Sequence, residues 1–333
     1  MGIVDGFIGK YKYIRSIKDL ENIYDGSYAF VGVGGHSTSN LYPVLDYLHV
    51  PLKYICCKSK YKVPLLQRRF RNVSCTSSID EILDDTQVKG VFVSAAPGSH
   101  YEIASKILGS GKSLFIEKPP CSTCSELNDL IEREASNNAL LTMVGMQKRY
   151  SPLTCILRKK LAKSTVASYN LVYRTGLYPE GDSLLEIFIH PLDYVVFMFG
   201  KASVVGCRRL SHPGGGETIM LSHEHTFGML ELSTAYSWTD ACENISINTS
   251  DGVFTLNQME DLTFVPRIGS LFGLPKDKIF PRKALSASVK LYSRNNFSPT
   301  IFNNQIYTQG FYNEVKSFVE LVEKNKGSNL SSF

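Results

Sequence analysis

Short apolar segments alternate with helix-like segments through the first half of the chain, and this rhythm constrains the fold more than any other feature. The apolar segments are unbroken runs at residues 28–33, 52–57, 90–94, 113–116 and 140–144. The segments between them, at 38–48, 78–83, 101–108 and 123–136, have helical spacing or helix-start signals. Such continuous apolar strands, each followed by a helix, predict a parallel sheet covered on both faces.

The pattern changes after about residue 150, where apolar and polar residues alternate with a period of two. Alternation of this kind predicts an antiparallel sheet with one face more exposed. The expected strands lie at 166–173, 203–209, 218–222, 228–233, 244–249 and 253–257. Helices are expected at about 183–198 and 309–325, and loops near 211–216 and 266–300.

Composition and charge exclude several classes of protein. Of the 333 residues, 43% are hydrophobic and 20% charged, as in an ordinary folded protein, and the net charge of +5 is dispersed, which argues against a nucleic-acid surface. No apolar run approaches the roughly 18–20 residues of a membrane helix, and no signal peptide is recognised. The eight cysteines are expected to be reduced, so the sequence predicts a cytoplasmic enzyme.

A glycine-rich turn follows the first strand: Gly32-Val33-Gly34-Gly35-His36-Ser37. Its place between a strand and a helix fits a dinucleotide fingerprint, in which Gly32 permits the tight turn and Gly34 lets a pyrophosphate approach the backbone. Ser37 is small enough for close packing of the helix on the strand. The alternative is an ordinary glycine-rich connection, because this motif alone is weak.

The end of the second strand decides between cofactors. An enzyme that uses NAD places an acid there to bind the ribose 2′-hydroxyl. Here the strand runs into Lys58-Ser59-Lys60 with no acid. Two cations and a hydroxyl suit a 2′-phosphate, so NADP(H) is favoured and NAD(H) remains possible. The alternative is a solvated basic loop.

Three further segments make the pattern specific. Ala95-Ala96-Pro97-Gly98-Ser99-His100 follows one strand, Glu117-Lys118-Pro119-Pro120 follows the next, and Val144 to Pro152 contains Gln147, Lys148 and Arg149. Together with the glycine-rich turn and a later Glu186–Asp193 segment containing His190, the chain resembles the Gfo/Idh/MocA oxidoreductase family. The resemblance covers about residues 28–325 and implies a Rossmann domain over 28–150 and an α+β domain over 151–333, with 1–27 as an N-terminal extension.

The resemblance also implies roles for individual residues. Lys118 corresponds to the lysine beside the nicotinamide and the substrate hydroxyl, Pro119 to a residue that is often cis, and Asp193 to a structural acid. His190 corresponds to the general acid/base, and Glu186 stands where the family has Asp. The implied catalytic set is Lys118, His190 and Glu186, without a metal. The implied cofactor-binding set is Gly32, Gly34, Gly35, His36, Ser37, Lys58, Ser59, Lys60, Ala96, Pro97, His100, Glu117, Lys118, Gln147 and Arg149.

The residue types suit this chemistry by themselves. Transfer of a hydride from a secondary alcohol needs a base for the hydroxyl proton, and an imidazole with a pKa of about 6.5 serves in both directions. A lysine ammonium stabilises a developing alkoxide. If residues 183–198 form one helix, Glu186 and His190 lie four residues apart and share a face. Taken alone, such a pair is more often a surface pair.

The sequence therefore predicts an NAD(P)-dependent oxidoreductase of a sugar, nucleotide-sugar or cyclitol, forming a homodimer or homotetramer through the second sheet, without nucleic-acid or membrane partners. Two alternatives remain open. One is an NAD-assisted glycosidase of the same fold. The other is a silent dinucleotide-binding regulatory protein, suggested by Glu186 and by Phe188, which stands where the family has Gly and is expected to make the cleft bulkier.

Two other constellations have ordinary explanations. His223 and His225 would face one side of a strand and could bind a metal, but the sequence places no third ligand. Cys121 and Cys124 have CxxC spacing at a helix start, which can lower a thiol pKa. Neither has the sequence context of a metal or redox site, so both are interpreted as structural.

Overall fold

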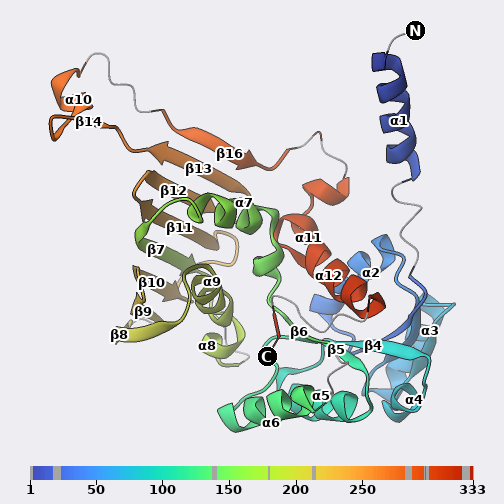
Figure 1. The fold of residues 1–333 in the computed structure, drawn as a ribbon. Coiled ribbons are helices and arrows are strands. Elements are labelled where there is room, and N and C mark those ends of the chain that lie inside the picture. The colour runs from blue at the N-terminus through green and yellow to red at the C-terminus, as the bar shows by residue number, and fades with distance from the viewer. Residues whose placement is uncertain are drawn as a thin grey trace. The chain divides into compact units, whose positions relative to one another are not determined.

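The computed structural model describes most of the chain, and its contacts divide the chain into two units. The described residues are 3–17, 24–136, 141–178, 181–211, 215–281, 287–295, 297, 300–324 and 331–332. The first unit comprises residues 1–145 and 314–333, and the second comprises residues 146–313. Each unit is built around its own sheet (Figure 1).

The first unit contains a parallel sheet, as the five apolar runs predict, together with a sixth parallel strand at Ser74–Thr76 that they do not predict. Its order is β3-β2-β1-β4-β5-β6, so the winding direction reverses between β1 and β4. In open sheets of this kind, ligands bind at the carboxyl ends of the strands beside that reversal. The strands are β1 (Ser27–Val31), β2 (Leu52–Cys56), β3 (Ser74–Thr76), β4 (Val88–Val93), β5 (Ser113–Glu117) and β6 (Thr142–Gly145).

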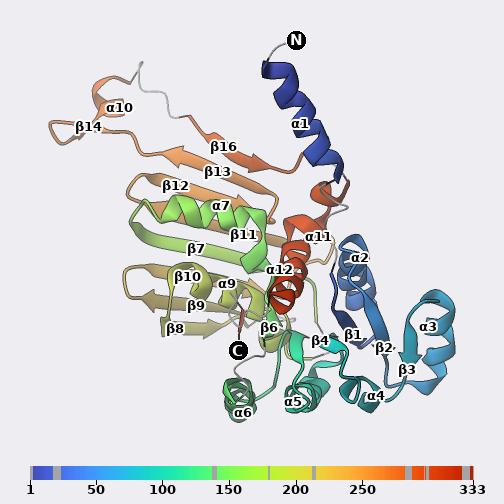
Figure 2. The ribbon, with the colours of Figure 1, turned by 45° about the vertical axis from the view of Figure 1, so that its right-hand side comes forward.

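Helices cover both faces of this sheet, with α5 and α6 on one face and α2 and α12 on the other (Figures 1 and 2). The helical elements are α1 (Ile3–Ile17), η1 (Ser37–Leu41), α2 (Tyr42–Tyr47), η2 (Lys60–Lys62), α3 (Val63–Arg69), α4 (Asp80–Leu83), η3 (Pro97–Ser99), α5 (His100–Gly109), α6 (Cys124–Ala135) and α12 (Phe311–Glu323). Pro43 is the second residue of α2 and directly follows the π-helical turn η1, so it interrupts a continuous helical segment at the point where the hydrogen-bond pattern changes. A capping box between Thr123 and Glu126 begins α6.

The end of the chain returns to the first unit, which corrects the prediction that residues 151–333 form one domain. Phe318 of α12 packs edge-on against Phe92 and Phe115, with ring centroids 5.1 and 5.7 Å apart. The Tyr28 hydroxyl donates a 2.8 Å hydrogen bond to Glu323. A strand face with several buried aromatic rings needs an apolar cover, and the apolar stripe of α12 supplies it.

The second unit contains an eight-stranded, mostly antiparallel sheet of order β16-β13-β12-β11-β7-β10-β9-β8, in which β7 and β10 are parallel. All six predicted strands are present. The strands are β7 (Val166–Arg174), β8 (Ala202–Arg209), β9 (Gly216–His223), β10 (Phe227–Ser233), β11 (Cys242–Thr249), β12 (Gly252–Asn257), β13 (Asp261–Pro266) and β16 (Val289–Ser293), with a separate hairpin of β14 (Ser270–Leu271) and β15 (Leu274–Pro275). Thus β14, β15 and β16 lie within the predicted loop at 266–300.

Helices α7 (Pro152–Leu161) and α9 (Ile189–Phe199) cover one face of this sheet (Figure 2). Leu157 of α7 and Val195 of α9 are fully buried with strand residues such as Leu230. The remaining helical elements of this unit are η4 (Gln147–Tyr150), α8 (Ser183–Glu186), α10 (Lys276–Ile279), η5 (Thr300–Asn303) and α11 (Gln305–Thr308).

The prediction of a single helix at 183–198 is wrong, because the structure contains two helices there, α8 and α9. Pro191 explains the division: it has no N–H to donate to the carbonyl of Ile187, and its ring would collide with that carbonyl in a continuous helix. Pro191 instead lies in the first turn of α9, a position that tolerates proline. The four-residue spacing predicted that Glu186 and His190 are neighbours on one helix face, but they lie on two different helices.

Candidate functional site

The glycine-rich turn lies where the sheet reverses direction. Gly32 follows β1 with a φ of +109°, and a Cβ atom there would lie 2.0 Å from the carbonyl oxygen of Ser94. Only glycine fits this position. Ser37 is fully buried, and its hydroxyl accepts a 2.9 Å hydrogen bond from the Gly34 N–H. A Cβ on Gly34 or Gly35 would meet no atom within 4 Å, so the backbone there is open to a ligand.

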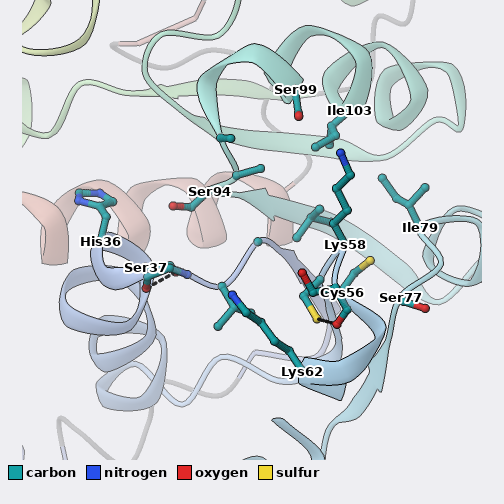
Figure 3. A pocket seen from close by; sticks show the side chains of 18 of the residues that line it. His36, Ser37, Cys56, Lys58, Lys62, Ser77, Ile79, Ser94, Ser99 and Ile103 are labelled. Carbon is teal, nitrogen blue, oxygen red and sulfur yellow. Dashed lines mark hydrogen bonds between the residues drawn. The ribbon is translucent and has the colours of Figure 1, made fainter. Parts of the chain in front are cut away.

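A cavity of about 620 Å³ opens beside this turn (Figure 3). Its lining comes from the carboxyl ends of β1, β2 and β4 and from α5, all in the first unit. Of the predicted cofactor-binding residues, Gly32, Gly34, Gly35, His36, Ser37, Lys58, Ser59 and Ala96 line it. Lys60, Pro97, His100, Glu117 and Lys118 are not among the lining residues.

The cations at the cavity differ in part from those the sequence suggested. Lys58 and Lys62 line the cavity, whereas Lys60, on η2 between them, does not. Figure 3 shows the side chains of Lys58 and Lys62 extending from the loop after β2 into the cavity. Lys60 and Lys62 are the first and last residues of η2, a single 3₁₀ turn, so their side chains point in different directions and only Lys62 reaches the cavity. The sequence did not predict this short helical turn.

The turn after β5 is closely packed. The peptide bond between Lys118 and Pro119 is cis, as the resemblance implies. Glu117 is 5% exposed, and a Cβ on Gly145 of the neighbouring strand would lie 3.0 Å from its carboxylate carbon. His36 Nε2 lies 3.1 Å from Glu117 Oε1. The Lys118 side chain is partly exposed at this edge of the sheet.

His100 is buried, 1% exposed, at the start of α5. Its Nδ1 lies 2.7 Å from the carbonyl oxygen of Pro119, and its Nε2 lies 3.0 Å from that of Ala95. The ring therefore joins the segment after β4 to the turn after β5.

The predicted residues of the second unit have well-defined partners. Arg149 forms a two-pronged ion pair with Asp193, and its guanidinium lies 5.2 Å from the ring centre of Phe197. This pairing agrees with the structural role implied for Asp193. It also means that two of the guanidinium nitrogens of Arg149 already donate hydrogen bonds within the protein. Gln147 is buried on η4.

Glu186 and His190 lie on α8 and α9. The Tyr178 hydroxyl donates a 2.6 Å hydrogen bond to the Glu186 carboxylate. His190 is the second residue of α9 and is partly exposed. Phe188, between the two helices, is 2% exposed and packs edge-on against Tyr173 at 6.2 Å. It belongs to the core of the second unit, so the expectation that Phe188 makes a cleft bulkier is wrong.

The other two constellations are structural where the structure describes them. His223 ends β9 and is buried, with its ring nitrogens 2.8 Å from the Gly200 carbonyl oxygen and 2.8 Å from the Tyr169 hydroxyl. His225 lies beyond the strand and is exposed, so the two histidines do not share a strand face. Burial raises the pKa of the Cys121 thiol, the opposite of what a reactive cysteine needs. Within the described ranges, no three potential metal ligands of the His, Cys, Asp or Glu type gather at one point.

None of the helices in the described part of the chain combines the length and apolar character required to cross a bilayer.

Comparison with known proteins finds a family match for part of the first unit. Residues 27–146 match the Gfo/Idh/MocA family, described as an oxidoreductase family with an NAD-binding Rossmann fold. This match agrees with the family resemblance found in the motifs.

Curated relatives are similar over part of their length. An uncharacterized oxidoreductase of Escherichia coli is 27% identical over 191 residues, which are 52% of this chain and 53% of that protein. Inositol 2-dehydrogenase of Salmonella typhimurium is 23% identical over 36% of this chain and 38% of its own. The chain thus spans about half the length of the first relative and less of the second.

Solved structures share the whole fold. A levoglucosan dehydrogenase in complex with NADH and L-sorbose has a TM-score of 0.76 at 15% identity, over 93% of this chain and 92% of that chain. A 3-ketoreductase from Actinomadura kijaniata, in complex with TDP-benzene and NADP, has a TM-score of 0.70 at 14% identity, over 91% of each chain. The predicted fold class, a Rossmann domain followed by a largely antiparallel α+β domain, is confirmed.

Proposed function

We propose that this chain is an NAD(P)-dependent oxidoreductase that acts on a CH–OH group of a sugar-like substrate. The observation that carries the proposal is the cavity at the reversal point of the parallel sheet, bounded by a glycine-rich turn whose backbone is open at Gly34 and Gly35. Its position, its glycines and its lysines fit a dinucleotide. The names of the relatives, which include an inositol 2-dehydrogenase and a levoglucosan dehydrogenase, support the substrate class.

The residues divide the work as follows. When bound, the nicotinamide accepts or donates the hydride. Gly34, Gly35 and the buried Ser37 hold the turn against the pyrophosphate. Lys118 stabilises the developing alkoxide with its ammonium group, and the imidazole of His190 takes or returns the hydroxyl proton. Glu186, which accepts a hydrogen bond from Tyr178, is assigned to the substrate side through the family resemblance.

The test of the function is a substrate screen. The purified chain is mixed with NADP⁺ or NAD⁺ and a panel of sugars, cyclitols and nucleotide sugars, and formation of the reduced cofactor is followed by absorbance. Reduction that depends on one sugar class supports the proposal. Tight cofactor binding without turnover on any panel member would favour the silent dinucleotide-binding alternative. Cleavage of a glycoside without net reduction would favour the glycosidase.

We further propose that NADP(H) is preferred. Lys58 and Lys62 extend into the cavity from the segment that follows β2. Among the described residues that line the cavity, the acidic residue is Glu102, which lies on α5 and pairs with Lys106. Two ammonium groups without a carboxylate on that loop suit a phosphate dianion. The structure of a fold relative with NADP, and of another with NADH, shows that the fold accepts either cofactor.

NADPH is expected to bind several-fold more tightly than NADH, and Lys58→Asp is expected to reverse or abolish this preference. Both affinities are measured by cofactor fluorescence titration. Lys60→Asp is the matched control, because it makes the same charge change two residues away on a lysine outside the cavity lining. Equal affinities in the unmodified protein, or equal effects of the two substitutions, would contradict the preference.

We propose that the protein forms a homodimer or homotetramer through the second sheet. We also propose that it works in the cytoplasm, whose reducing conditions suit its eight unpaired cysteines. On the sheet face opposite its buried side, Met220 and Met229 are cross-strand partners, each 39% exposed, and Phe227 is 44% exposed. Exposed apolar side chains on neighbouring strands are typical of protein interfaces.

Met229→Lys is expected to shift the protein to a smaller species in size-exclusion chromatography with light scattering, because an ammonium group would be buried in the interface. His225→Lys, which adds a charge at an exposed turn residue, is the control and should leave the assembly intact. A monomeric unmodified protein at micromolar concentration would contradict the assembly.

A further inference from the structure

Two histidines hold the turn that carries Lys118, one on each side of it. His36 contacts Glu117, the residue before Lys118, and His100 contacts the carbonyl oxygen of Pro119, the residue after it. All of these residues belong to the first unit. Both histidines were predicted to bind the cofactor, but His100 lies outside the cavity lining.

His100 bridges two backbone segments that no ladder of the sheet joins at this point. The ring is 1% exposed, and its nitrogens lie 2.7 Å from the Pro119 oxygen and 3.0 Å from the Ala95 oxygen. Both partners are acceptors, so a neutral ring donates to one of them at a time and a doubly protonated ring donates to both. Without the ring, two carbonyl groups at the carboxyl edge of the sheet lose their described side-chain donor.

His36 holds the other side of the turn. Asn40 Nδ2 lies 3.1 Å from His36 Nδ1 and can donate to it, which leaves the hydrogen on Nε2, 3.1 Å from Glu117 Oε1. This contact is close but not aligned as a hydrogen bond, since Oε1 makes none in the described part of the chain. It is therefore the weaker of the two supports. Figure 3 shows the His36 ring at the edge of the cavity.

We infer that His100 and His36 are positioning residues that fix the Glu117-Lys118-Pro119 turn and thereby the ammonium group of Lys118. Lys118 is joined by one peptide bond to each of the two supported residues. A displacement of about 1 Å in a positioned group costs roughly 10²-fold in rate, so loss of the stronger support is expected to reach the chemistry. The catalytic part of this inference rests on the proposed function, and the placement of Lys118 does not.

The first measurement does not depend on activity. Lysines are labelled by reductive dimethylation with formaldehyde and a borohydride reagent, and the labelling rate of each is followed by mass spectrometry. His100→Gln is expected to raise the rate at Lys118 at least threefold, because the turn loosens, and to leave the exposed Lys106 unchanged. His36→Gln, at a less buried position, should raise it by less. His225→Gln is the control. Unchanged labelling of Lys118 in His100→Gln that keeps the unmodified melting temperature would overturn the inference.

The second measurement is a double-mutant cycle on hydride transfer. His100→Gln is expected to lower kcat by about 10- to 100-fold with little change in cofactor affinity. In a Lys118→Ala background the same substitution should have almost no further effect, because the group it positions is gone. An equal loss in both backgrounds would mean a merely structural role. Altered Lys118 labelling in a protein that transfers no hydride would support the positioning of Lys118 by the two histidines and reject the proposed function.

Discussion

Replacing Lys118 by alanine is expected to lower turnover by about 10²–10⁴-fold, the usual scale for a positioned acid, base or electrostatic group. The ammonium group is proposed to stabilise the negative charge that develops on the substrate oxygen. The fold should survive, because the Lys118 side chain is partly exposed at the edge of the sheet. The measurement is single-turnover hydride transfer with a substrate found in the screen.

His190→Ala is expected to have an effect of the same order, since it removes the proposed proton acceptor while leaving the partly exposed start of α9 intact. Lys60→Ala is the control for both substitutions, because Lys60 is exposed and does not line the cavity. Turnover at the unmodified rate in both Lys118→Ala and His190→Ala would refute the assigned roles. It would also make a silent dinucleotide-binding protein the leading interpretation.

The second large effect concerns stability. Lys148 and Glu243 form a buried ion pair in the second unit, 2.5 Å apart, with side chains 6% and 9% exposed. Lys148 also lies 4.8 Å from the ring centre of Tyr173. Lys148→Met is expected to reduce the free energy of unfolding by about 3–5 kcal/mol, because it leaves the Glu243 carboxylate buried without its partner.

Urea unfolding measures this change. Lys290→Met, which breaks an exposed pair with Asp261, is the control and should cost no more than about 1 kcal/mol. The double variant Lys148→Met/Glu243→Leu should recover much of the loss, since no uncompensated charge remains. A loss below about 1 kcal/mol in Lys148→Met would show that water reaches the carboxylate.

Much of the fold was predictable because its signals are local. Most strands of both sheets follow from apolar runs and from alternation, although β3 and β13 were not predicted. The α6 cap follows from Thr123 and Glu126. The β14–β16 region escaped prediction because it is rich in Gly, Pro and Ser and has little periodicity. The Gly32 turn was also predictable, since a tight turn with a positive φ directly after a strand requires glycine.

The sequence by itself determined most strands and helices of this protein, its resemblance to a known family and most of the segments that border the cavity. The tertiary structure alone decided which residues of those segments meet. It brought α12 to the first sheet, paired Arg149 with Asp193, buried Phe188, turned Lys62 rather than Lys60 into the cavity and placed His100 against Pro119. The physical reason is distance along the chain. Periodicity and capping act between residues a few positions apart, whereas these contacts depend on which faces of distant elements pack together.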